Sequence, residues 1–171
     1  MNAWIIGGAL VALGAGYAQV SRDVVAPITA QLYVEERDAQ RAINSQAIAE
    51  VLIRRSRRAG ATIAQLQSGA KVDKYTGPIS AWEGFEAALS DGYAAAAADP
   101  QFRARAAGAA WRAYFAIRWG IGDQVAPGAL WYRHAARAEL PQRWGRTKLA
   151  RVLDAPRGKV LGLYVPAPAG E

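Results

Sequence analysis

Two neighbouring glutamates, Glu35 and Glu36, stand in the segment Leu32-Tyr33-Val34-Glu35-Glu36-Arg37-Asp38, on a helix that must face the core on one side. A carboxyl group that aromatic walls shield from water has a raised pKa, stays protonated and can donate its proton to a glycosidic oxygen. Successive residues of a helix point about 100° apart. We therefore expect one of the two glutamates to face a cleft and the other to face water.

An aromatic segment follows much later in the chain, at residues 123–134, and ends in the sole histidine, His134. We expect it to be a loop. A sugar ring stacks on Trp or Tyr side chains, so a helix-borne glutamate opposite this loop would make a workable glycan cleft. Trp131, Tyr132 and His134 are candidate substrate walls. Asp123, at the start of the segment, is a possible second acid, although an Asp beside Gly and Pro is also typical of a turn.

Cysteine and histidine content limits the remaining chemistry. The chain has no Cys and one His in 171 residues. This excludes disulfides, a cysteine nucleophile, iron–sulfur and zinc-thiolate sites, and multi-histidine metal centres. We therefore expect no cofactor and no metal, and any catalysis must use carboxylates, hydroxyls or the backbone.

The net charge of +7 is concentrated in the C-terminal part of the chain. Residues 1–99 hold 9 cationic and 10 acidic side chains, whereas residues 100–171 hold 12 and 4. A basic half attracts polyanions, which include nucleic acid, an anionic membrane surface and the bacterial cell wall. No nucleic-acid-binding motif accompanies the charge, so nucleic acid is not the expected partner.

The N-terminal residues 3–20 carry no charge. Their length is close to the minimum for a membrane span, which predicts a membrane anchor over residues 1–21. Gly16-Tyr17-Ala18 is a passable signal-peptide cleavage site, but no Lys or Arg precedes the apolar run, which favours an uncleaved anchor. Gly8, Ala12 and Gly16 form a stripe of small residues along which copies of the helix could self-associate.

Helical periodicity and capping signals predict the next elements. Apolar spacing over residues 29–58 indicates one long helix or two, with a possible break at Asn44-Ser45 and a stop at Gly60. The arginines at the end of this segment are expected in solvent. Capping boxes predict further helices that begin at Ile63 and Ala81.

The C-terminal part begins with a strong helix start at Asp99-Pro100, and this helix is expected to end at Gly120. Residues 151–154 and 159–165 flank a Pro/Gly turn and predict a β-hairpin. The fold class is therefore mainly α (α+β), with a membrane anchor, a helical domain over residues 22–165 that ends in a small hairpin, and a tail at 166–171.

A resemblance covers most of residues 30–165. The chain resembles the cell wall hydrolase family of spore-cortex-lytic enzymes. In that family the motif Tyr-Gly-Glu-Ala-Arg-Gly-Glu is followed by Gly-Gln and by a run that ends in Asn-Arg-Val. Later in the family's sequences come Asp-Pro-Thr-Gly-Gly-Ala, then aromatic residues and His, and then Pro-x-Trp. The corresponding residues are Tyr33-Val34-Glu35-Glu36-Arg37-Asp38, Ser45-Gln46, residues 48–55, Asp123, Gly128-Ala129-Leu130-Trp131-Tyr132-Arg133-His134 and Pro141-Gln142-Arg143-Trp144.

The resemblance implies a divergent lysozyme-like domain that cleaves peptidoglycan glycan strands. Glu35 matches the family's first Glu and would be the general acid, with Glu36 as its local rival and Gln46 among the substrate-binding residues. In such enzymes a single carboxyl can both protonate the leaving oxygen and take the proton of the sugar's 6-hydroxyl. No partner carboxylate is obvious, which favours a lytic transglycosylase over a hydrolase.

Two further readings stay open at this stage. Val34 and Asp38 replace two family glycines, which suits a non-catalytic, membrane-inserted protein of a virion or envelope that kept the fold. Nucleic-acid association through the basic half is the third reading. An active enzyme would be membrane-anchored with its catalytic domain toward the cell wall, or associated with a phage virion.

Overall fold

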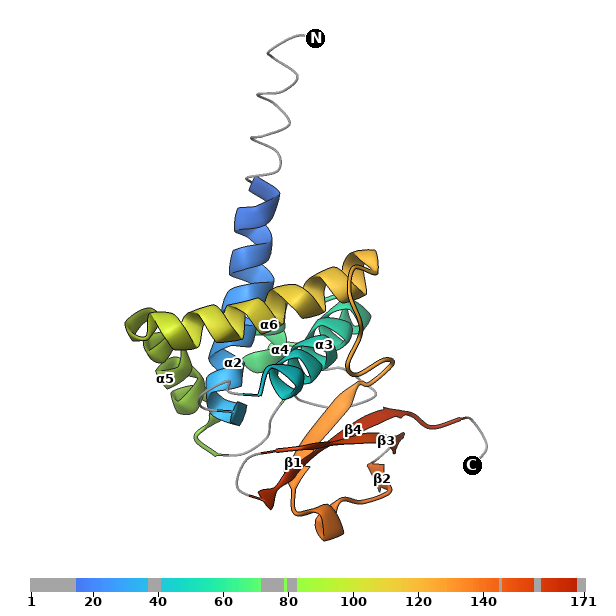
Figure 1. The fold of residues 1–171 in the computed structure, drawn as a ribbon. Helices are drawn as coiled ribbons and strands as arrows, with labels where there is room; N and C mark the ends of the chain where they lie inside the picture. Colours follow the sequence, from blue (N-terminus) through green and yellow to red (C-terminus); the bar gives the residue numbers. More distant parts are fainter. Residues whose placement is uncertain are drawn as a thin grey trace, which may run out of the picture.

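The computed structural model describes residues 15–36, 41–71, 79, 83–144, 146–155 and 158–168. Helices come first in the chain, and an antiparallel sheet of four strands follows them. Figure 1 shows the helices on one side of the molecule and the sheet on the other. The α+β class is therefore confirmed.

The N-terminal helical rod crosses the middle of the helical layer. Residues 15–20 are helical and continue into the π-helical turn η1 (Ser21–Val25) and then α2 (Ala26–Glu36). Pro27 has no N–H to donate along the helix, which accounts for the wider turn before it. Ile28, Ala30 and Leu32 of α2 are fully buried, because α2 packs against both α5 and α6.

The other helices surround α2 and supply most of the core. They are α3 (Ala42–Ala59), α4 (Ile63–Gln67), α5 (Phe85–Ala98) and α6 (Pro100–Trp119). α3 packs against α6, and α5 packs against α2. At this second contact Gly92 is required, because a Cβ atom there would clash with the backbone carbonyl of Ala30.

The sheet is built around a C-terminal hairpin. Its strands are β1 (Trp131–Ala135), β2 (Arg143–Trp144), β3 (Thr147–Asp154) and β4 (Val160–Pro166), and the short helix η2 (Arg137–Glu139) lies between β1 and β2. The strand order is β1-β4-β3-β2. Leu153, Leu161 and Leu163 join the main core with the helices, so apolar packing holds the sheet against the helical layer.

Local signals predicted several helix ends correctly. Thr62 and Gln65 form the expected capping box, and Asp99 accepts hydrogen bonds from the N–H groups of Gln101 and Phe102. Gly60 and Gly120 end α3 and α6 with φ values of 60° and 66°. These positions depend on residues close in sequence, which is why local patterns sufficed.

Other expectations require correction. Asn44-Ser45 is no break, because both residues are buried within the first turns of α3. The described part of α5 begins at Phe85, after a turn at residues 83–84, while the predicted start at Ala81 lies outside the described residues. The predicted hairpin is present as β3 and β4, but it is the centre of a four-stranded sheet.

The aromatic segment and the N-terminal anchor also differ from their predictions or lie partly outside the described residues. Trp131, Tyr132 and His134 lie on strand β1 and not on a loop. Among the described helices, none has the length and apolarity that a membrane crossing requires. Residues 1–14 of the predicted anchor, with Gly8 and Ala12 of the small-residue stripe, lie outside the described residues.

Candidate active site

Glu35 and Glu36 close the C-terminal end of α2, and both approach strand β1. The side chain of Glu35 is 20% exposed and that of Glu36 is 1% exposed. The expectation that one of the pair faces water is therefore wrong. Burial of two adjacent carboxylates requires partners, because a charged group loses its hydration in the protein interior.

Strand β1 provides these partners from alternate positions. Side chains two residues apart on a strand point to the same face, and Tyr132 and His134 both point toward the end of α2. The hydroxyl of Tyr132 donates to Glu35 Oε1 at 2.9 Å. The Nε2 atom of His134 lies 3.0 Å from Glu36 Oε1, and its Nδ1 atom lies 3.6 Å from Glu35 Oε2. We call these four residues the Glu–His cluster.

Three amides from the helices surround the Glu–His cluster. Gln31 Nε2 donates to Glu35 Oε1 at 3.0 Å, and Gln67 Nε2 donates to Gln31 Oε1 at 3.1 Å. Asn44 Nδ2 donates to the carbonyl of Asp154 at 2.9 Å and lies 3.4 Å from Glu36 Oε1. All three amide side chains belong to buried residues.

Sequence reasoning missed these amides. Their signal was available, because each is a polar residue at an apolar-facing helical position. A buried side-chain amide needs polar partners.

The electrostatics of the cluster favour a protonated imidazole. Burial lowers the pKa of His134. Hydrogen bonds to Glu35 and Glu36 and the charges of both groups have the opposite and larger effect, and together they raise the pKa to about 9. Burial, together with the charge of Glu35, raises the pKa of Tyr132 well above its ordinary value. At neutral pH His134 is therefore protonated where it lies between Glu35 and Glu36, and Tyr132 keeps its proton and is a hydrogen-bond donor.

Trp131 belongs to a separate aromatic and cationic column. It alternates with Tyr132 along β1 and stacks on Trp144, with ring centroids 6.1 Å apart. The guanidinium of Arg55 lies 4.8 Å from the Trp131 ring centroid, and that of Arg133 lies 4.6 Å from the Trp144 centroid. Such cation–π contacts stabilise the curled sheet against α3. Arg55 is buried, so the expected solvent position of this arginine is wrong.

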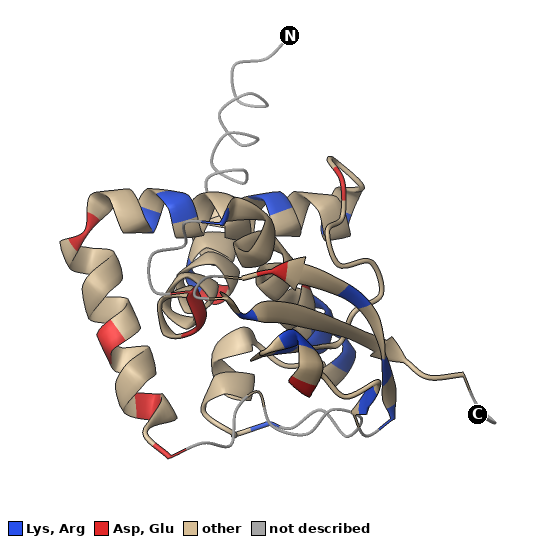
Figure 2. Cartoon of the chain, turned by 60° about the horizontal axis from the view of Figure 1, so that its bottom comes forward, with Lys and Arg blue, Asp and Glu red and all other residues tan. Residues whose placement is uncertain are grey.

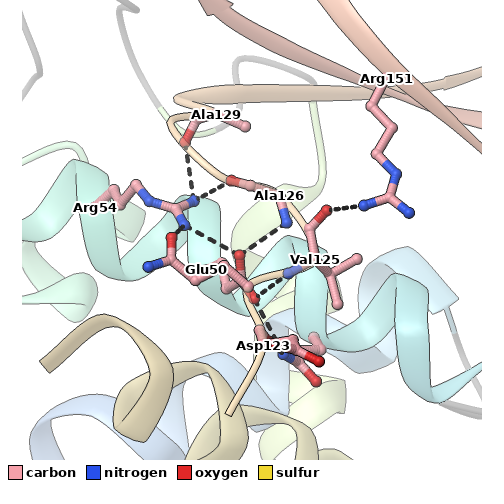
Figure 3. Close-up of polar contacts among 9 residues, drawn as sticks. Glu50, Arg54, Asp123, Val125, Ala126, Ala129 and Arg151 are labelled. Atoms are coloured by element: carbon pink, nitrogen blue, oxygen red, sulfur yellow. Dashed lines mark hydrogen bonds and ion pairs between the residues drawn. The ribbon is translucent and has the colours of Figure 1, made fainter. Parts of the chain in front are cut away.

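Gln46 and Asp123 lie in a second polar network, which is centred on Glu50 (Figure 3). Glu50 is fully buried and accepts hydrogen bonds from the N–H groups of Val125 and Ala126 at 2.8 and 2.9 Å. Arg54 pairs with Glu50 at 3.0 Å. Gln46 donates to Glu50 and to the carbonyl of Asp123.

This Glu50 network clamps residues 123–129, which precede β1, onto α3. It therefore positions the strand that bears Tyr132 and His134. Glu50 is a residue that sequence reasoning did not single out, although a lone acid on the apolar face of a helix was a usable signal.

Within the ranges that the structure describes, no group of three or more His, Asp or Glu side chains is arranged to hold a metal ion.

We compared the chain with models of protein families, with curated proteins and with solved structures, and none of the three comparisons found a match.

Proposed function

We propose that this chain cleaves the glycan strands of peptidoglycan by a lytic transglycosylase reaction, with Glu35 as the general acid and base. The observation that carries the proposal is the half-buried carboxylate of Glu35 at the end of α2, which faces Tyr132 and His134 on the sheet. The lysozyme-like resemblance of the sequence adds to this support. The uncharged residues 3–20 would tether the enzyme to a membrane beside the wall.

The proposed reaction needs one carboxyl group. Glu35 donates a proton to the glycosidic oxygen as the bond between that oxygen and the sugar C1 breaks. The Glu35 carboxylate then removes the proton from the 6-hydroxyl of the same sugar, and the hydroxyl oxygen bonds to C1. The product is a 1,6-anhydro sugar, no water is consumed, and Glu35 recovers its proton.

His134 supplies the first proton in this scheme. Its imidazolium Nδ1 faces Glu35 Oε2 at 3.6 Å. When a glycan covers the site and excludes water, a neutral Glu35–His134 pair is favoured over a charged pair, because desolvation penalises charge. The proton then moves from Nδ1 to Oε2. Glu36 contacts the imidazole from its other side, and Asn44 donates to the Glu36 carboxyl oxygen that makes this contact.

The first test is mass spectrometry of the soluble products after the full chain is incubated with purified peptidoglycan. The parent should release anhydro-muropeptides, and Glu35→Gln should reduce the rate by at least about 100-fold. Glu83→Gln is the matched control, because Glu83 is exposed and lies outside the cluster. A folded parent that releases no products would contradict the proposal and favour the non-catalytic virion or envelope reading.

The pH profile separates the roles of the two glutamates. Activity of the parent should fall as the pH rises past about 9, where His134 loses its proton. Glu36→Gln removes one of the two groups that raise the pKa of His134, so the basic limb should move to lower pH while activity persists. If Glu36→Gln abolishes cleavage and Glu35→Gln does not, the assignment of the acid is wrong.

A further inference from the structure

The outer face of α6 carries a continuous row of aromatic rings. Trp111, Phe115 and Trp119 recur at every fourth residue, and successive ring centroids are 5.5 and 5.2 Å apart. Tyr17, from the N-terminal rod, extends the row by stacking on Trp111 at 5.0 Å with an interplanar angle of 10°. We call these four residues the aromatic row.

The aromatic row is only partly covered by the core: Trp111 and Phe115 are partly buried, and Trp111 packs against the edge of the core. Phe102, Ala106, Ala109 and Ala113 make the buried side of α6, and helical geometry places the row on the opposite side. Tyr17 is 63% exposed and Trp119 is 57% exposed. Large apolar rings that adjoin one another in water mark an interaction surface, whereas isolated exposed rings do not.

Cationic side chains border the aromatic row. α6 bears four arginines and no acid, and both Arg112 and Arg118, beside the row, are exposed. Figure 2 shows positive segments along α6, in contrast to the acidic segments of α5, where Glu86 and Asp91 lie. The partner of this face must therefore accept aromatic rings and supply negative charge.

The chain itself indicates which partner this is. Tyr17 belongs to the uncharged stretch of residues 3–20, and Figure 1 shows the described rod leaving the helical layer past α6. Trp and Tyr side chains concentrate at the headgroup level of bilayers, and Arg side chains pair with anionic headgroups there. A second copy of the chain fits less well, because a two-fold contact would place Arg112 and Arg118 against like charges.

We propose that the outer face of α6 lies on an anionic lipid bilayer, with the aromatic row at headgroup depth and Arg112 and Arg118 against lipid phosphates. The helical layer then rests on the membrane, and the sheet points away from it. This inference is independent of the glycan chemistry proposed above, because no residue of the Glu–His cluster takes part.

A single-cysteine fluorescence experiment tests the orientation. The chain has no native Cys, so one introduced Cys takes one environment-sensitive label. Ala104→Cys lies on the same side of α6 as Trp111, seven residues away, and leaves the row and its arginines intact. Ala150→Cys, at an alanine on β3 that is also exposed, is the matched control.

The full chain is reconstituted into vesicles of phosphatidylcholine, with or without phosphatidylglycerol, that contain nitroxide-labelled lipid. The label at position 104 should be quenched several-fold more strongly than the label at position 150. Phosphatidylglycerol should increase that quenching. A combined Arg112→Gln and Arg118→Gln change should remove the increase, and Trp119→Gln should weaken quenching in both kinds of vesicle.

Three outcomes would overturn the proposal. Equal quenching at positions 104 and 150 would show that α6 does not face lipid. A label at position 104 that becomes shielded with rising protein concentration, without vesicles, would assign the face to a second copy. Shielding by single-stranded nucleic acid in preference to anionic vesicles would assign it to that polyanion.

Discussion

The free energy of unfolding should fall as the pH rises from 6.5 to about 9, because His134 loses its proton over this interval. Burial lowers the pKa of His134, but the hydrogen bonds and charges of Glu35 and Glu36 raise it from 6.5 to about 9 in the folded chain. The folded state therefore binds this proton more tightly than the unfolded state. The resulting stabilisation is complete below pH 6.5 and is lost as the pH rises through about 9.

The size of this effect follows from the shift of the pKa. One pKa unit corresponds to about 1.4 kcal/mol, so the rise from 6.5 to about 9 is worth about 3 kcal/mol. The His134 side chain is 17% exposed, so solvent screening removes little of it. This stabilisation is a large fraction of a typical free energy of unfolding of about 5–15 kcal/mol. Its loss at high pH should lower Tm by about 6–12 °C.

Few other groups of the chain titrate over this pH interval, so the change in unfolding free energy can be assigned to His134. His134 is the only histidine and there is no cysteine, so the α-amino group is the main other group that titrates in this interval. Urea unfolding of the parent, followed by Trp fluorescence across the interval, should show the loss. The variant His134→Gln should show almost none.

Nuclear magnetic resonance gives a second readout that does not depend on the variant. The single imidazole signal of the parent should titrate near pH 9. A midpoint near the ordinary value of 6.5 would show that Glu35 and Glu36 do not contact His134 as described. A free energy of unfolding of the parent that is constant over the interval would show the same.

Two further predictions concern stability. Glu50→Gln should cost about 3 kcal/mol, because it leaves the partly buried Arg54 guanidinium without its carboxylate and replaces a carboxylate that accepts from two backbone N–H groups by a neutral amide. The exposed Glu86→Gln should change stability by less than about 0.5 kcal/mol in the same urea titration. Gly92→Ala should lower Tm, because its Cβ meets a backbone carbonyl of α2, whereas Gly108→Ala, on the open side of α6, should raise it. Equal shifts for the two alanines would contradict the close packing of α5 on α2.

The helix ends could be predicted because their causes are local. A Thr or Asp cap and the N–H groups that it binds lie within three residues of each other. Thr62 and Asp99 therefore predict from the sequence alone where their helices begin. The failure at Asn44 has the opposite cause. Its amide does not compete with the helix backbone, but reaches the carbonyl of Asp154, 110 residues away.

The residues of the Glu–His cluster were predicted, but their arrangement was not, because it also depends on contacts between residues far apart in the sequence. Glu35, Glu36, Tyr132 and His134 were all singled out, but whether the two glutamates separate or converge depends on strand β1, almost 100 residues later. A helical wheel assigns neighbouring residues to different directions. It cannot include an imidazole that contacts both carboxylates with its two nitrogen atoms.

Strand β1 is fixed to the helical layer by two carboxylate networks, and only one of them contains His134. Glu50 holds residues 125 and 126 ahead of the strand, and the Glu–His cluster holds the strand itself at Tyr132 and His134. Glu50 contacts neither Tyr132 nor His134, so its loss should destabilise the fold without removing the groups that set the pKa of His134. Loss of Glu36 should lower that pKa, because the imidazolium then has one carboxylate neighbour and not two, and should also remove part of the stability that the raised pKa provides. Because the chain is held both ahead of the strand and within it, the imidazole of His134 stays beside Glu35, as the proposed proton transfer requires.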